Sequence, residues 1–155
     1  MTSEDAAKRA QELFLSGFHC SQAVFAAIAE KFGMEPSEDV IAALSPFGGG
    51  IGCNGDVCGV LSGAVAAVGF LMGKRAPGQK DHKEMWRLSR RVVDAFGDIT
   101  KVYGGPNCSD IARVDWGNVL HVRAFRKDPD SRRAECVMVM GKMAELLARL
   151  LERGI

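Results

Sequence analysis

The first sixteen positions of the chain alternate apolar and polar residues with the spacing of one face of an α-helix. The apolar face contains Ala6, Ala10, Leu13 and Phe14, which follow one another at the three- and four-residue spacing of a helix face. Thr2 supplies the polar residue that starts such a helix. We predict an amphipathic helix from this start to Ser16-Gly17.

Similar periodicity continues along most of the chain, and glycine and proline interrupt it. Gly33 follows the second apolar stretch, where a left-handed residue is expected to end a helix. Residues 116–125 are ambiguous, and no stretch alternates with the period of two that a half-buried strand requires. The further predicted helices span residues 21–32, a short stretch after Pro36, and residues 56–73, 80–102, 107–114 and 130–153.

These elements predict an all-α fold, a compact helical bundle in one domain of residues 1–155, with a glycine-rich loop leading into a buried central helix. The central segment, residues 57–73, carries no charge. It is at the short end of what a bilayer requires, which favours a buried helix over a membrane span. Gly59, Gly63 and Ala67 lie four positions apart, so we expect another helix to approach that face closely.

Charge and composition exclude several classes of partner. The net charge is +1 and 25% of the residues are charged. No basic cluster with interleaved aromatic residues indicates nucleic-acid binding. The N-terminus has no secretion signal pattern, so we expect a cytoplasmic protein. In a reducing compartment its five cysteines are expected to be metal ligands, redox-active thiols or buried small side chains rather than permanent disulfides.

The glycine-rich loop contains the spacing of a dinucleotide-binding turn at Gly50, Gly52 and Gly55. That spacing indicates a nucleotide site only when a strand precedes it and an acidic residue follows about twenty positions later. The preceding segment is predicted to be helical, and Lys74 and Arg75 follow instead. We therefore predict no nucleotide, and a tight turn between packed helices.

Three cysteines, Cys20, Cys58 and Cys108, lie at predicted helix N-termini, and Cys136 lies about two turns into the last helix. A helix N-terminus lowers a thiol pKa, so we expect these thiols to be partly ionised at neutral pH. His19 precedes Cys20 and is a candidate base or ligand, or a capping residue. The plainer alternative is that each cysteine is a small buried side chain.

The cysteine spacing excludes several familiar sites. The chain has no CxxC pair, and it lacks the CxxCH sequence of covalent haem attachment and the paired knuckles of a zinc ribbon. Cys53 and Cys58 match only the first part of a plant-type iron–sulfur spacing. Any disulfide or cluster must therefore join cysteines that are distant in the sequence.

Four cysteine segments carry a resemblance to a known family. The segments are GFHCSQAV, FGGGIGCNGDVCGVLSGAVAAVG, GPNCSDI and AECV. From about Gly17 to Cys136 the chain resembles the redox-active family (C_GCAxxG_C_C) that is defined by four cysteines and a CGAxxG motif. Val60 stands where that motif has alanine, and Cys53 is additional to the four.

The resemblance implies a small, mostly helical protein with a redox role. We predict reversible thiol–disulfide exchange or electron transfer, as in a thiol-dependent oxidoreductase, by Cys20, Cys58, Cys108 and Cys136. One alternative is a non-catalytic module in which these thiolates, with Cys53 or His19, bind an iron–sulfur cluster or a soft metal ion. Another is a structural homodimer with buried cysteines. The redox partner is not identified by the sequence.

Overall fold

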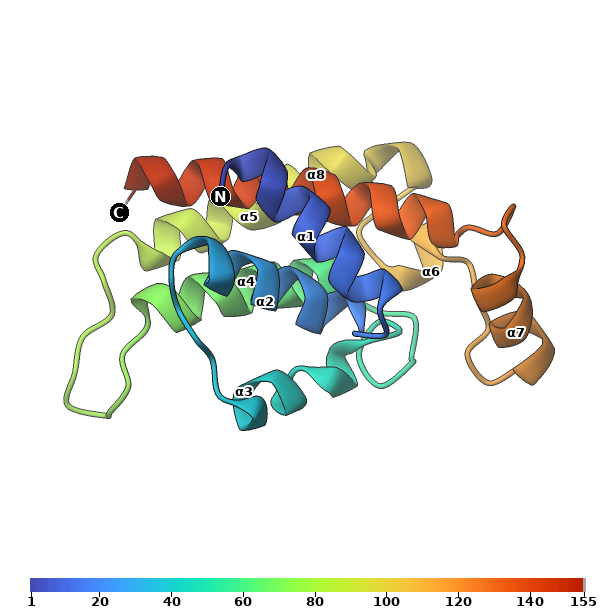
Figure 1. Cartoon of the computed structure of the whole chain (residues 1–155), viewed down its shortest axis with the longest axis horizontal. Coiled ribbons are helices and arrows are strands. Elements are labelled where there is room, and N and C mark those ends of the chain that lie inside the picture. The colour runs from blue at the N-terminus through green and yellow to red at the C-terminus, as the bar shows by residue number, and fades with distance from the viewer. Residues whose placement is uncertain (155) are drawn as a thin grey trace.

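The computed structural model describes residues 1–154, and its elements are helices (Figure 1). Within this range only an isolated bridge, Val57 with Asn107, pairs backbone segments in the manner of a sheet. The all-α prediction is therefore confirmed. The elements are α1 (Ser3–Leu15), α2 (Cys20–Lys31), α3 (Glu38–Ala43), the 3₁₀ turn η1 (Ser45–Phe47), α4 (Gly59–Met72), α5 (Met85–Thr100), the 3₁₀ turn η2 (Lys101–Tyr103), α6 (Cys108–Ile111), α7 (Val119–Lys127) and α8 (Arg133–Gly154).

Local signals in the sequence determine where the first two helices begin and end. The Thr2 hydroxyl accepts a hydrogen bond from the Asp5 N–H at 3.1 Å, and the Asp5 carboxylate accepts one from the Thr2 N–H at 2.7 Å. This reciprocal cap satisfies N–H groups that a helix start leaves unpaired. Gly33 follows α2 with a φ of 69°, as predicted for a left-handed residue after a helix end.

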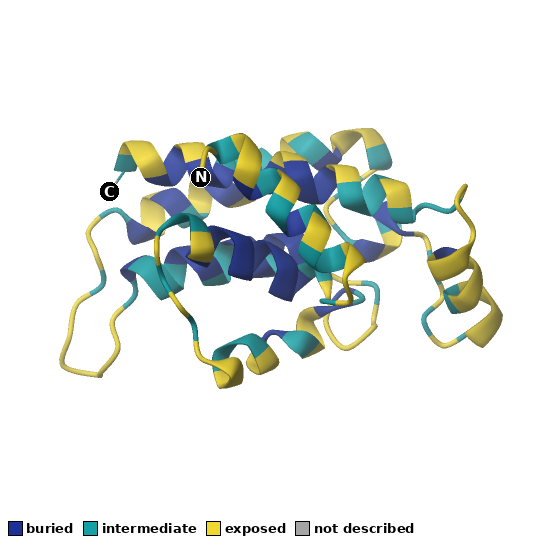
Figure 2. Cartoon of the chain, viewed as in Figure 1, coloured by how far each residue is buried: buried dark blue, intermediate teal, exposed yellow. Residues whose placement is uncertain are grey.

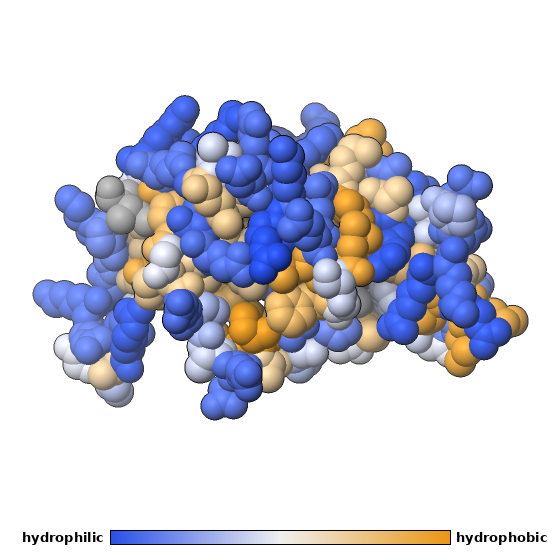
Figure 3. Space-filling model, in the orientation of Figure 1, coloured by the Kyte–Doolittle hydropathy of each residue, from blue (hydrophilic) through white to orange (hydrophobic). Residues whose placement is uncertain are grey.

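The core lies between α2 and α4 and extends to α8. Figure 2 shows buried residues along most of α2 and α4 and on the inner side of α8. Hydrophilic side chains dominate the outer surface over α1 and α8 in Figure 3. The uncharged segment is thus a central buried helix, as expected. None of the helices in residues 1–154 combines the length and hydrophobicity that crossing a bilayer requires.

Two glycines of α4 allow the start of α2 to approach it at backbone distance. A Cβ added to Gly63 would stand 2.3 Å from the Ser21 carbonyl oxygen. A Cβ added to Gly59 would stand 2.4 Å from the Cys20 sulfur. The close helix approach predicted from the glycine spacing is confirmed, and the contact is made within the chain.

Several boundaries and orientations differ from the predictions. α5 begins at Met85 rather than Lys80, and α8 begins at Arg133 rather than Asp130. Most of the ambiguous segment 116–125 lies in the helix α7. The Asn118 side chain caps the start of this helix by accepting hydrogen bonds from the N–H groups of Leu120 and His121. Val93 and Trp86 are large apolar residues of the predicted helix over 80–102, but Val93 is 46% exposed and Trp86 is 72% exposed. Both lie on the outer side of α5, where the core does not reach.

Candidate functional site

The glycine-rich loop forms a left-handed turn. Residues 49–53 all have positive φ, between 59° and 73°, and two of them, Ile51 and Cys53, are not glycine. Left-handed backbone costs a non-glycine residue about 1–2 kcal/mol. The turn is fixed by hydrogen bonds from the Gly52 N–H to the Pro46 carbonyl (2.7 Å) and from the Cys53 N–H to the Gly48 carbonyl (3.3 Å). It leaves Cys53 exposed.

Backbone hydrogen bonds join the end of this loop to the segment before α6. The Cys58 N–H donates to the Pro106 carbonyl at 3.2 Å, and the Cys108 N–H donates to the Asp56 carbonyl at 2.7 Å. These hydrogen bonds place Cys58 and Cys108, which are distant in the sequence, on two backbone segments that lie side by side. Asp56 does not cap α4: its carboxylate accepts a hydrogen bond from the Asn54 side chain, and Cys58 occupies the capping position.

The N-terminal ends of α2, α4 and α8 meet at one end of the bundle, beside the glycine loop and α7 (Figure 1). Between them lies a cavity of about 640 Å³. Cys136 is the fourth residue of α8, so it lies in the first turn and not two turns into the helix as predicted. All five cysteines are free, and all five line this cavity: Cys20, Cys53, Cys58, Cys108 and Cys136.

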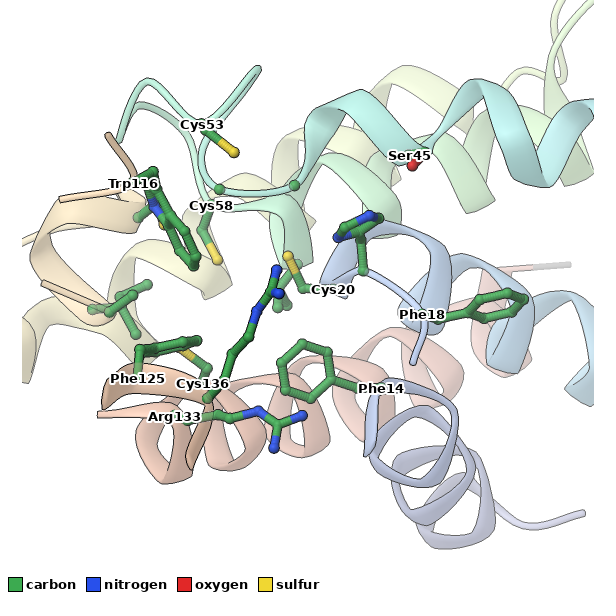
Figure 4. A pocket seen from close by; sticks show the side chains of 18 of the residues that line it. Phe14, Phe18, Cys20, Ser45, Cys53, Cys58, Trp116, Phe125, Arg133 and Cys136 are labelled. Atoms are coloured by element: carbon green, nitrogen blue, oxygen red, sulfur yellow. The ribbon is translucent and has the colours of Figure 1, made fainter. Parts of the chain in front are cut away.

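Cys20 lies where α2 and α4 approach most closely. Its sulfur lies against Gly59, where a Cβ would collide with it. The backbone N–H groups of Cys20, Ser21 and Gly49 face the sulfur and favour its thiolate. Figure 4 shows the Cys20 and Cys58 sulfurs directed toward the same space. These two thiols come from the starts of the two helices that pack most closely at Gly59 and Gly63.

The thiol pKa values shift in the direction opposite to our expectation. Burial raises the pKa of Cys20 to about 11 and that of Cys136 to about 12, and it raises the pKa of Cys58 well above the usual value. Neighbouring cysteines raise these pKa values further, because two thiolates repel each other. Burial also raises the pKa of Cys108. The prediction of partly ionised thiols at neutral pH was wrong, because loss of solvation outweighs the helix N-termini.

This burial predicts that the reduced protein loses stability in alkali. An unfolded thiol ionises near pH 8.5, whereas the buried thiols keep their protons until about pH 11 to 12 for Cys20 and Cys136. The stabilisation is therefore complete below pH 8.5 and is lost as pH rises toward the folded-state values. We expect the free energy of unfolding, measured by urea titration with a reductant present, to fall by about 2 kcal/mol for each such thiol between pH 8 and pH 10, or about 4 kcal/mol for Cys20 and Cys136 together.

A matched variant tests the origin of that loss. In Cys136→Ser the slope of stability against pH should be smaller, because one buried ionisable thiol is removed. A stability that stays constant up to pH 10 would contradict the assignment of these thiols as buried and protonated.

Two buried donors beside the thiols have no acceptor. Within residues 1–154 the only buried side-chain N or O atoms without a hydrogen-bond partner are Trp116 Nε1 and Arg132 Nη2. The Trp116 N–H lowers the pKa of Cys108, and the Arg132 charge lowers that of Cys136, although burial dominates both. A buried unpaired donor costs about 1–3 kcal/mol. Trp116 lines the cavity, so its N–H favours an acceptor there in addition to the Cys108 sulfur.

The sequence did not identify the other side chains that line the cavity. Phe14, Phe18, Trp116 and Phe125 give it an aromatic wall, and Arg126 and Arg133 give it positive charge (Figure 4). These residues come from α1, α7, α8 and the segments between helices, and they share no motif. Of the candidates named from sequence, His19 also lines the cavity, is exposed, and starts α2 through its backbone N–H, which donates to Gln22 at 3.0 Å.

The arrangement of candidate ligands bears on the metal and cluster alternative. In the described chain, no three or more His, Cys, Asp or Glu side chains are grouped so that they could hold a metal ion. The donor set in this arrangement does not fit a cluster, although all of its thiols line one cavity. The chemistry that this geometry supports is therefore that of the thiols themselves.

Comparison with known proteins gives one family and one curated relative. The profile of the family described as "Putative redox-active protein (C_GCAxxG_C_C)" matches residues 18–150. An "Uncharacterized protein" of Archaeoglobus fulgidus is 28% identical over 113 residues, which cover 70% of this chain and 75% of the relative. No solved structure matches the chain significantly.

Proposed function

Because this chain belongs to the C_GCAxxG_C_C family of redox-active proteins, we propose that its cavity thiols carry out reversible thiol–disulfide exchange. The observation that supports this function is the lining of one cavity by five free cysteines, which lie at the starts of α2, α4, α6 and α8 and in the glycine loop. Such a cavity admits a small disulfide to several thiols at once. We assign the exchanging pair to Cys20 and Cys58, whose sulfurs face the same space.

The exchange proceeds in two displacements. The Cys20 thiol loses its proton, and the thiolate attacks one sulfur of the substrate disulfide. The substrate S–S bond breaks, and the first substrate thiolate leaves and takes up a proton. Cys58 then loses its proton and attacks the Cys20 sulfur of the mixed disulfide. A Cys20–Cys58 disulfide forms, and the second substrate thiol leaves protonated, so two electrons and two protons have passed to the substrate.

The backbone around Cys20 supports its role as the attacking thiol. Three N–H groups face its sulfur, which stabilises the thiolate that the first displacement requires. Burial nevertheless raises its pKa to about 11. Exchange should therefore be slow at neutral pH and accelerate as pH rises toward that value, since only the thiolate attacks.

The homodimer alternative loses one of the two arguments on which it was based. We inferred a dimer from the small-residue face of the central helix and from the amphipathic helices at the two ends of the chain. Gly59 and Gly63 on that face are in contact with the start of α2 in the same chain. This face is therefore occupied without a second copy.

Mild oxidation of the reduced wild-type protein tests the function. We expect two of the five thiols to be lost, with the intact mass decreasing by two hydrogen atoms and peptide mapping locating the bond between Cys20 and Cys58. Thiols that react only after unfolding would reject the exchange function. Iron and sulfide in protein purified without oxygen would favour the cluster alternative instead.

A further inference from the structure

We infer that the substrate of this cavity is a small disulfide that carries carboxylate groups. The inference rests on the proposed exchange function and adds the class of substrate. Its basis is the charge of the cavity lining. Among the described residues that line it, Arg126 and Arg133 are the only Arg, Lys, Asp or Glu side chains.

Neither arginine is neutralised by a protein carboxylate. The ion pairs found within residues 1–154 involve Arg9, Lys31, Arg87 and Arg149, and none involves Arg126 or Arg133. The acidic residues that follow Arg126 in sequence belong to a turn, where Asp128 accepts the Asp130 N–H at 2.9 Å. The two guanidinium groups are therefore available to an anionic ligand, and arginine is well suited to carboxylates.

Aromatic side chains position this charge beside an apolar surface. The Arg133 guanidinium lies over the Phe14 ring, 5.0 Å from its centre, and Figure 4 shows the pair at the wall of the cavity. The rings of Trp116 and Phe125 pack edge to face, with their centres 5.4 Å apart, on the side of the cavity next to α7. A ligand that meets both features has an apolar middle and a charged end.

The unpaired Trp116 N–H provides an independent indication of an acceptor. This N–H is buried and lies beside the Cys108 sulfur, but in the described chain it makes no hydrogen bond of normal geometry, and Trp116 lines the cavity. A carboxylate or a thiolate from the substrate would satisfy it. A volume of about 640 Å³ lies within the range of about 300–1,000 Å³ that small-ligand pockets occupy.

Three disulfides of similar size and different charge test the inference. Dithiodipropionate carries two carboxylates, bis(hydroxyethyl) disulfide is neutral, and cystamine carries two ammonium groups. We expect dithiodipropionate to oxidise the cavity thiols about tenfold faster than the neutral reagent, and cystamine to be slowest. Added salt should reduce the difference.

Charge-removing variants show whether the cavity arginines cause that preference. Arg126→Gln and Arg133→Gln should each remove most of the advantage of dithiodipropionate. Arg91→Gln removes the same charge from an exposed position of α5 outside the cavity and should leave the order of rates unchanged. Equal rates for the three reagents, or an equal effect of all three variants, would overturn the inference.

A binding measurement separates this inference from the exchange function. Suberate has the length of dithiodipropionate but no sulfur, and octanediol is its neutral counterpart. In a Trp86→Phe background, where Trp116 is the remaining tryptophan, we expect suberate and not octanediol to change the fluorescence. If no disulfide reacts but suberate binds through the arginines, the exchange function fails and the anion site stands. If exchange occurs without charge preference and suberate does not bind, the inference fails alone.

Discussion

Replacing Gly63 with alanine is expected to lower the free energy of unfolding by about 3 kcal/mol, the upper end of what overpacking costs. The added Cβ would stand 2.3 Å from the Ser21 carbonyl oxygen and 2.9 Å from the Ser21 Cα. These are backbone atoms at the start of α2, so no side-chain rotation relieves the contact. Alanine gains about 1 kcal/mol over glycine within a helix, which is too little to offset the collision.

Gly69 of the same helix is the matched control. A Cβ added there meets nothing within 4 Å, so Gly69→Ala should raise the free energy of unfolding by about 0.5–1 kcal/mol. Urea unfolding followed by circular dichroism measures both variants. If Gly63→Ala were as stable as the wild type, the close approach of α2 and α4 would be contradicted.

The same substitution connects packing to the cavity. Ser21 follows Cys20 directly, so displacing the start of α2 also moves the Cys20 sulfur away from Gly59 and from the Gly49 N–H. The close approach that stabilises the bundle therefore also positions the proposed attacking thiol. In Gly63→Ala we expect slower oxidation of the cavity thiols even at temperatures where the variant remains folded.

The helices were predictable where the signal is local. The helix start at Thr2 and the left-handed residue Gly33 depend only on residues nearby in the sequence, and both predictions are confirmed. α7 was not resolved, because its apolar residues Val119 and Leu120 are 72% and 70% exposed and so do not follow the pattern of a buried face. Val93 likewise belongs to the apolar pattern of its helix but is not covered by a neighbouring helix. A periodic pattern predicts a helix but does not determine how far the neighbouring helices cover it.

The sequence allowed us to predict that the cysteines gather at helix ends, but not the pKa values of their thiols or the arginines beside them. The sequence predicted that Cys20, Cys58, Cys108 and Cys136 converge near helix ends, and these four cysteines do line one cavity. Their pKa values depend on how deeply several helices enclose them together, which no local spacing encodes. Arg126 and Arg133 lie in sequence among other surface basic residues. Only the crossing of α1, α7 and α8 places them beside the sulfurs.

Replacing Cys20 with serine is expected to slow formation of the intramolecular disulfide by at least about a hundredfold, as loss of an attacking nucleophile does. Serine is smaller than cysteine, so it fits the space against Gly59, and circular dichroism should show that the fold is retained.

Cys53→Ser is the control: Cys53 lines the same cavity but is exposed on the left-handed turn, so this variant should still form the bond. The readout is the loss of two hydrogen atoms in intact mass, because modification of a single thiol does not produce it. A Cys20→Ser protein that closes a disulfide at the wild-type rate would remove Cys20 from the exchanging pair. Two of the remaining cavity thiols, Cys58, Cys108 and Cys136, would then have to supply both partners.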